Sequence, residues 1–443
     1  MLAFLLGVRS FWIQKYCNAQ IEIRAAQACG EDSRGDRDDV GSRRSAATRL
    51  VSPLDHHDAY MNTVARLLQR ARAVTSLHDF GEDSFHEGLD ILVNSAEAEA
   101  RLTERGREGF EMQIVDLLCN RLQVEHWYGL HPEIDQQEIV EPLIGLGLPR
   151  TGSTALSCLL AEDPAVRSIR NWEALAPCPP PEAATQDSDP RIQRSQLMLD
   201  RRNSLYPRMK TMVPSTTTSP TECQTFMGYD FKSQLFQAMF QIPSYVEWLN
   251  HKADLVPTYL YVKRVLKLLQ WRCPPRHWRL KNPSHCIFID ALAKVFPDAR
   301  FWMTHRDVAA VIPSVADLYY ELTKASSHAV NKLWLGHMTT DFCELGMRRM
   351  MAFRDAGNEH RFFDIYFTPF QKDPIAHVAQ LYDFLGDELT PQARARMEAW
   401  RRDTPRDKHG GHNYDPAEFG LDPTQLRDRF AFYSERFSGV LAA

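Results

Sequence analysis

The chain has 443 residues, 44% of them hydrophobic and 25% charged, and its formal net charge is −5. This composition is typical of a folded globular protein longer than one average domain. A pI near 6.4 argues against a general nucleic-acid binder, because such proteins carry an excess of basic residues. The nine cysteines form no C-x-x-C pair, which argues against a zinc ribbon or a disulfide framework and favours the reducing cytoplasm. No apolar run reaches membrane-spanning length.

Residues 1–55 are predicted to form a disordered tail, because residues 30–48 are dense in Asp, Arg, Gly and Ser. The first residues are apolar but lack the basic start and cleavage site of a signal peptide. We expect the folded part to begin near Asp55, with Met61 as an alternative start. Residues 56–140 repeat apolar side chains at three- and four-residue spacing, which predicts an all-helical N-terminal region.

An apolar run at residues 142–148 ends in a Gly/Pro turn and continues into a helical pattern. This order predicts a strand, an anion-binding loop and a helix whose positive end faces the bound anion. The spacing of Gly147 and Gly152 matches a nucleotide P-loop, but Ser153 replaces its lysine. Arg150 is the nearby cation, so the loop suits a single phosphate or sulfate group better than a magnesium-bound triphosphate.

A second strand is predicted at residues 299–304, and Arg306 follows its end. Ligands of open parallel sheets collect at the carboxyl ends of strands. Ser314 lies eight residues further on, about two helical turns, so both side chains can face one side. Pro313 is expected to kink or interrupt this helix. An arginine and a serine hydroxyl together suit a second phosphate.

The PRTGST loop, followed about 150 residues later by an arginine and a serine, resembles the sulfotransferases, and its arginine makes it similar to bacterial members. The resemblance covers roughly residues 70–440 and implies 3′-phosphoadenosine 5′-phosphosulfate (PAPS) as sulfuryl donor. It implies that the 3′-phosphate is held by Arg306 and Ser314. The 5′-phosphosulfate would be held by Arg150, Thr151, Gly152, Ser153 and Thr154.

Three further segments fit the same family. Lys281, at the end of a short strand, resembles the lysine that approaches the transferring group. Tyr366 resembles a tyrosine that borders the adenine, although Phe367 and Thr368 replace the usual acidic pair. Residues 409–414 resemble a glycine-rich segment that covers the nucleotide.

A base must take the proton of the acceptor hydroxyl. The resemblance implies Glu173 as first choice, because a glutamate often follows the first helix in related enzymes, and His285 as second. Glu222 is a third candidate. Catalysis would depend on positioning and electrostatics, with loop N–H groups, Arg150 and Lys281 as donors and no metal.

The predicted fold class is α/β, a P-loop-like parallel sheet flanked by helices. Strands are expected near 143–148, 277–281, 300–304 and 361–367, within an α/β domain over 141–440. A helical insert at about 191–270, rich in aromatic residues and Met, is expected on the acceptor side. The acceptor is a small molecule, lipid or glycan, and the insert leans toward an apolar alcohol. The oligomeric state is not predicted.

Two alternative functions stay open. A P-loop nucleotide kinase or NTPase would fit the loop, and residues 286–290 imitate its magnesium-binding strand, but they continue with helical periodicity. A nucleotide-binding adaptor without catalysis would keep Arg150 and Arg306 but would need no base.

Overall fold

The computed structural model describes residues 53–273, 277–404 and 414–438. The predicted tail over residues 1–52 and most of the closing segment, residues 409–413, lie outside them. No helix in the described ranges is long and apolar enough to cross a membrane.

The described strands form one parallel sheet in the order β2-β3-β1-β4-β5. The strands are β1 (Leu143–Gly147), β2 (Val166–Arg167), β3 (His277–Lys281), β4 (Arg300–His305) and β5 (Phe362–Tyr366). β1 lies between β3 and β4, so the loop after β1 is flanked by the ends of both neighbours. This order brings segments that are far apart in the chain to one edge of the sheet.

Side chains alternate between the two faces of the sheet, as the pleat requires. Ile144, Phe301 and Met303 belong to the large core, whereas Leu143 and Trp302 belong to a smaller core. Gly145 pairs with Trp302, and a Cβ on Gly145 would lie 2.0 Å from the indole ring. The glycine therefore makes room for a buried tryptophan beside the strand that leads into the loop after β1.

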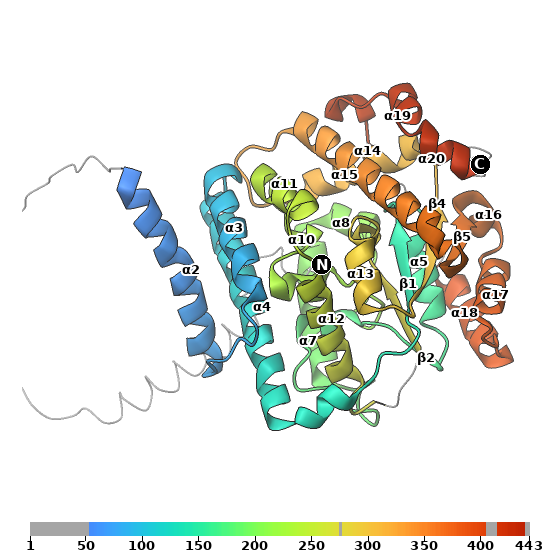
Figure 1. The fold of residues 1–443 in the computed structure, drawn as a ribbon, viewed down its shortest axis with the longest axis horizontal. Helices are drawn as coiled ribbons and strands as arrows, with labels where there is room; N and C mark the ends of the chain where they lie inside the picture. The colour runs from blue at the N-terminus through green and yellow to red at the C-terminus, as the bar shows by residue number, and fades with distance from the viewer. Residues whose placement is uncertain (1–52, 274–276, 405–413, 439–443) are drawn as a thin grey trace, which may run out of the picture.

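Helices cover both faces of this sheet (Figure 1). On the side of the smaller core lie α5 (Ser153–Leu160), α17 (Pro374–Leu385) and α18 (Pro391–Asp403), with α16 (Phe367–Lys372) after β5. The other face packs against the large core. Its helices include α13 (Ile289–Val295), α14 (Val308–Thr323), α15 (Lys332–Phe353), α19 (Pro423–Arg429) and α20 (Ala431–Arg436).

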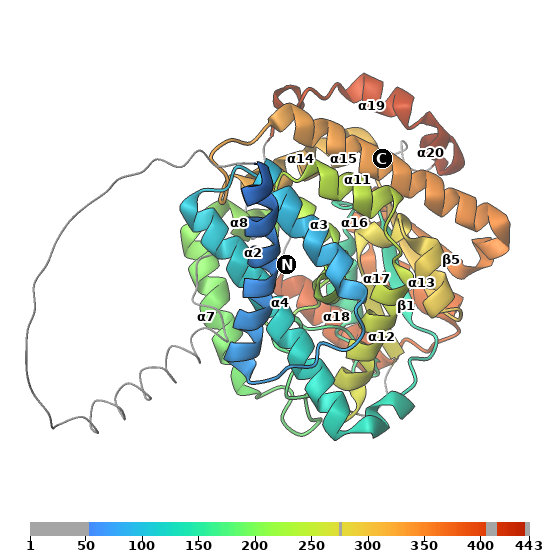
Figure 2. The same ribbon diagram turned by 60° about the vertical axis from the view of Figure 1, so that its left-hand side comes forward.

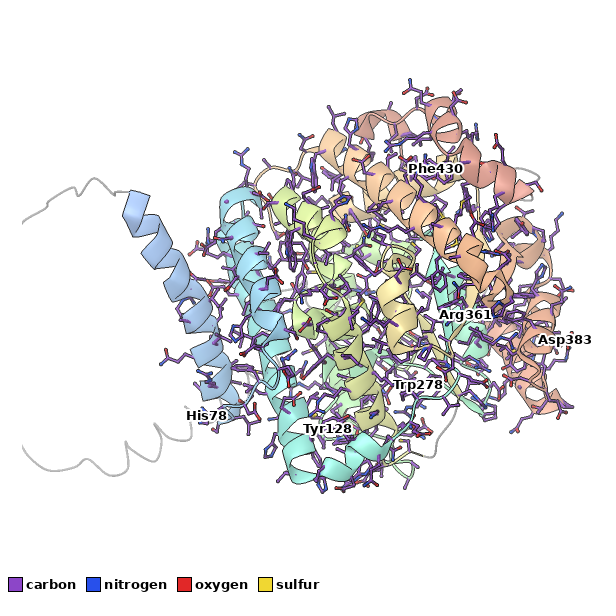
Figure 3. All side chains as sticks on the ribbon, viewed as in Figure 1. His78, Tyr128, Trp278, Arg361, Asp383 and Phe430 are labelled. Carbon is purple, nitrogen blue, oxygen red and sulfur yellow. The ribbon has the colours of Figure 1, made fainter. Side chains whose placement is uncertain are left out.

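The N-terminal helices gather at the side of the molecule opposite α16–α18 in Figure 1, and they lie in front in Figure 2. They are α2 (Pro53–Thr75), α3 (Ser84–Glu99) and α4 (Glu104–Leu130). Figure 3 shows Tyr128 near the end of α4 and Phe430 between α19 and α20, far from each other.

Residues 190–270 are largely helical, with α6 (Asn171–Leu175) before them. The helices are α7 (Pro190–Leu205), α8 (Pro207–Met212), α9 (Gln224–Met227), α10 (Gln234–Gln237), α11 (Pro243–His251) and α12 (Val256–Gln270). Arg121 joins them to the N-terminal helices. Its fully buried guanidinium lies between the Phe85 and Tyr261 rings and donates to the carbonyls of Phe80 and Tyr229. The two helical regions thus share one core.

The predicted fold class is confirmed: a parallel sheet is flanked by helices, with a helical N-terminal region. The two-residue strand β2 was not expected, because so short a segment has no periodicity to read. Pro313 does not interrupt its helix, because α14 continues through it, so that part of the expectation was wrong, and the expected kink stays a prediction. The division into domains stays a prediction.

Replacing Gly145 with alanine should lower the free energy of unfolding by about 1–3 kcal/mol, because the added methyl group overpacks against Trp302. Urea denaturation measures this. Gly109→Ala is the control: nothing lies within 4 Å of its added Cβ, and it lies within α4. It should stabilise by about 0.5–1 kcal/mol. Equal effects would contradict the packing argument.

Candidate active site

The loop between β1 and α5 turns through backbone conformations that L-residues rarely adopt. Gly147 has φ +112°, Arg150 +62° and Gly152 +87°. Glycine adopts such angles readily, but an arginine there is held by its surroundings. Gly152 is the N-cap of α5, so the helix N-terminus opens directly onto the loop. Tight left-handed turns directly before a helix N-terminus are the local conformation that the predicted anion-binding loop requires.

The two arginine-bearing turns meet. The Arg306 guanidinium donates to the backbone carbonyl of Arg150 at 2.9 Å, and Nε of Arg150 donates to Oγ of Ser314 at 3.3 Å. Arg150 also donates to the carbonyl of Met212 at the end of α8, 2.7 Å away. Burial and the nearby charge of Arg306 lower the pKa of Arg150. Two guanidinium groups at this separation repel each other. An anion bound between them would offset that repulsion.

The hydroxyl groups at the start of the helix differ in exposure. Thr154 is exposed and Ser153 is 8% exposed, both in the first turn of α5. Thr151 is fully buried, and its hydroxyl is within hydrogen-bond distance of the Leu148 carbonyl (2.8 Å) and the Thr304 hydroxyl (2.5 Å). The Thr151 hydroxyl thus braces the loop, and a place for this residue in the 5′ site stays a prediction.

An aromatic ring packs against Arg306. The Phe367 ring lies 4.2 Å from its guanidinium carbon, and a Cβ on Gly152 would lie 3.4 Å from the same ring. Phe367, which replaces the first residue of the family's acidic pair, thus forms a cation–π contact with Arg306. Tyr366, half-buried at the end of β5, lies beside His305. Tyr414 donates to the carbonyl of Ala310 on α14, so the chain after residue 413 returns to this site.

A chain of hydrogen bonds supports the backbone at Arg306. His305 Nε2 bonds the Asp364 carboxylate at 2.9 Å and Nδ1 bonds the Tyr433 hydroxyl at 3.0 Å. The backbone of Arg306 also lies near the Tyr433 hydroxyl, although burial dominates and raises the pKa of that tyrosine. Burial lowers the pKa of His305, which keeps the ring neutral, with one nitrogen donating and one accepting. Although burial alone would raise it, hydrogen bonds from Arg354 and His305 hold the pKa of Asp364 well below its usual range.

Lys281 lies at the end of β3, beside the loop, and pairs with Glu222 at 2.7 Å. The side chains are 9% and 22% exposed, so the pair is sheltered but reachable. Gln224 Nε2 donates to the second carboxylate oxygen of Glu222 at 3.0 Å. The structure therefore brings the predicted lysine together with Glu222, the third of the expected bases.

The structure does not bring Glu173 to the Lys281–Glu222 pair. Its carboxylate is fully buried and accepts from Arg167 at 2.7 Å and from the Arg170 backbone N–H at 3.0 Å. Arg167 pairs with Trp278, which lies toward the start of β3, whereas Lys281 ends that strand. The contacts of Glu173 therefore serve to hold α6 against β2, and they do not support a role as base.

His285, in the turn η4 (Pro283–Cys286), is 1% exposed. Its Nδ1 bonds the Tyr259 hydroxyl at 2.9 Å, and its Nε2 has no partner among the described residues. Burial lowers the pKa of His285 to about 3. A ring that binds a proton so weakly is a poor general base near neutral pH.

Comparison with known proteins defines the class. The model of the sulfotransferase family matches residues 142–391, more than half of the chain. Sulfotransferase STF9 from Mycobacterium avium is 31% identical, with 84% of this chain and 96% of that chain covered and a TM-score of 0.78. Sulfotransferase STF1 from Mycobacterium tuberculosis H37Rv is 29% identical, with 83% and 98% covered and a TM-score of 0.75. No curated protein sequence matches the chain.

The chain belongs to the sulfotransferase family. It shares the fold of these bacterial sulfotransferases over most of its length, including the helices before β1. Sequence reasoning missed Phe367 as the partner of Arg306, and it missed Tyr433 altogether. The sequence did mark Phe367 as unusual, because it stands where the family pattern has an acidic residue. Nothing in the sequence around Tyr433 marked that residue.

The buried imidazole of His285 should make stability depend on pH. The unfolded histidine binds a proton below about pH 6.5, whereas the folded one stays neutral to about pH 3. Stability should therefore fall as pH drops through this window, by up to about 1.4 kcal/mol per pH unit. His285→Asn, whose amide oxygen can accept from Tyr259, should reduce that slope in urea denaturation.

His126→Asn is the matched control, because this side chain is exposed on α4. It should leave the slope unchanged. A parent slope that His285→Asn does not alter would show that the pH dependence comes from other groups.

Proposed function

We propose that this protein transfers a sulfuryl group from PAPS to a hydroxyl group of an acceptor molecule. The observation that carries the proposal is the contact between the two arginine-bearing turns, because it sets two anion-binding elements side by side at one edge of the sheet. Arg306 and Ser314 would bind the 3′-phosphate. The 5′-phosphosulfate would be bound by the loop N–H groups with Arg150, Gly152, Ser153 and Thr154, while Thr151 braces the loop.

The reaction would be an in-line displacement. The bond between sulfur and the phosphate oxygen breaks as the acceptor oxygen bonds to sulfur, and the phosphate leaves with its electron pair. Lys281 would stabilise the charge that develops on the bridging oxygen. An ammonium has three donor hydrogens, so Lys281 can hold Glu222 and a second oxygen at once. Fixed positive groups would serve the leaving phosphate, and no metal is assigned to the reaction.

We assign the base to Glu222, which would accept the proton of the acceptor hydroxyl. Its support is the pairing with Lys281 and its partial exposure. We assign Tyr366 to the edge of the adenine site, because its ring lies beside His305, the residue before Arg306. The seven cysteines in the described residues are all free, which fits a cytoplasmic enzyme.

The direct test is incubation with labelled PAPS and a metabolite extract, followed by mass spectrometry for gain of one sulfonate. We expect a sulfonated product together with release of 3′-phosphoadenosine 5′-phosphate (PAP). Binding of PAP without any turnover would favour the adaptor alternative. Magnesium-dependent ATP hydrolysis without PAPS turnover would favour the NTPase alternative.

Arg306→Ala should weaken PAP binding by about 1.5–3 kcal/mol, the contribution of a hydrogen bond to a charged group. Calorimetry measures the affinity. Arg300→Ala is the control, because Arg300 begins β4, at the opposite end of the strand, with its guanidinium over Phe384. It should leave the affinity unchanged. Equal affinities of Arg306→Ala and the parent would remove the 3′-phosphate role.

Glu222→Gln should reduce turnover of PAPS by about 10²–10⁴-fold, the usual contribution of a general base. PAP affinity should stay close to that of the parent. Glu173→Gln tests the other candidate: it leaves Arg167 without its carboxylate and should lower stability, as removing one partner of a buried pair does. Turnover per folded molecule should be kept. The reverse pattern would return the role of base to Glu173.

A further inference from the structure

The short helix α8 of the insert ends against the arginine of the loop after β1. The carbonyl of Met212, the last residue of α8, accepts from Nη1 of Arg150 at 2.7 Å. Nε of the same guanidinium donates to Ser314 on α14 at 3.3 Å. A guanidinium carries five donor hydrogens in one rigid plane. These two contacts therefore set the direction in which its other donors point.

The first turn of α8 is joined to α14 by charged groups. Arg208 donates from Nη2 to the Asp317 carboxylate at 3.0 Å and from Nη1 to Glu321. The side chains of Asp317 and Glu321 are 9% and 7% exposed, whereas that of Arg208 is 47% exposed. Lys324 also donates to Glu321, at 2.6 Å. Arg208 thus bonds two sheltered carboxylates at once, which distinguishes it from an isolated surface ion pair of little value.

One face of α14 carries both sets of contacts. Ser314, Asp317 and Glu321 are three and four residues apart, the spacing that places side chains on the same side of a helix. Burial is the main cause that lowers the pKa of Arg150, and the charge of Asp317 opposes it. The carboxylate that holds Arg208 therefore lies close enough to act on the loop arginine.

Helix α8 depends on such contacts for its position. It has six residues, too few for a helix to be stable on its own in water. Met209 and Met212 are buried in the large core. Flexible methionine side chains tolerate small shifts, whereas an arginine that bonds two carboxylates has a defined geometry. The ion pairs of Arg208 therefore specify where the end of α8 lies.

We infer that Arg208 is a positioning residue for the sulfuryl donor. Its ion pairs fix α8 on α14, the helix places the Met212 carbonyl, and this carbonyl orients the Arg150 guanidinium toward the 5′ group. An arginine that is already oriented loses less side-chain freedom when an anion binds, so the anion binds more tightly. This inference rests on the proposed function, because it concerns the donor site assigned there.

The first test replaces Arg208 in the full chain. Arg208→Ala should weaken PAP binding about three- to tenfold, the value of one neutral hydrogen bond, because Arg150 keeps its charge but loses its fixed orientation. Arg208→Lys should have an intermediate affinity, since an ammonium can still bond one of the two carboxylates. Calorimetry measures the affinities. An unchanged affinity in Arg208→Ala would overturn the inference.

Lys210→Ala is the matched control. Lys210 is exposed on the same helix, so its replacement removes an equal positive charge. Because salt screens an exposed charge, PAP affinity at physiological salt should change less than about twofold. An equal loss in Lys210→Ala and Arg208→Ala would show that positive charge alone sets the affinity, and it would overturn the inference.

The two acids allow a test of opposite sign. If charge alone mattered, removing negative groups beside an anion site would strengthen anion binding. If Asp317 and Glu321 hold α8, the double variant Asp317→Ala/Glu321→Ala should instead weaken PAP binding, again about three- to tenfold. Arg208 and Lys324 are exposed and can be hydrated after these partners are lost. Unchanged or tighter binding would overturn the inference.

Hydrogen exchange in the nucleotide-free protein tests the position of α8 directly. Its amides should exchange faster in Arg208→Ala than in the parent or in Lys210→Ala. Faster exchange with unchanged PAP affinity would show that α8 does not position Arg150, and unchanged exchange would show that Arg208 does not hold α8. Either result would overturn the inference. Failure of the proposed function would look different: the parent itself would neither bind PAP nor consume PAPS.

Discussion

The site depends on one hydrogen bond, from the Arg306 guanidinium to the backbone carbonyl of Arg150. It fixes the turn after β4 to the turn after β1, and these strands are neighbours in the sheet although about 150 residues separate them in the chain. The bond also holds two positive groups at short range, and burial together with the charge of Arg306 lowers the pKa of Arg150. An anion bound between the two groups would favour the charged form of both.

Other buried charges in the molecule are arranged differently. Glu173 pairs with Arg167, Asp364 with Arg354, and Arg121 lies between two rings. These groups have their partners inside the protein and stabilise a single arrangement of helices.

Much of the framework could be predicted because it depends on local patterns. The strands at 143–147, 277–281 and 300–305 are short apolar or mixed runs bounded by turns, and the glycine loop has a strong signature. The resemblance to the sulfotransferases then predicted that Arg306 and Arg150 lie at the same site. The role of Glu222 was harder to rank, because only the tertiary structure shows that residue 222 reaches Lys281 and that Glu173 is enclosed. Phe367 contacts Arg306 and Tyr433 contacts His305, and both contacts join residues far apart in the sequence, which a periodic pattern cannot predict.

The support behind Arg306 reaches the last described helix, α20. Tyr433 in α20 hydrogen-bonds the ring of His305, the residue before Arg306, yet it lies outside both arginine-bearing turns. A chain that lacked α20, or an appended domain that pulled this helix away, would remove this support while the loop after β1 stayed intact. Under the proposed function, such a change would weaken donor binding without altering any residue that contacts the donor.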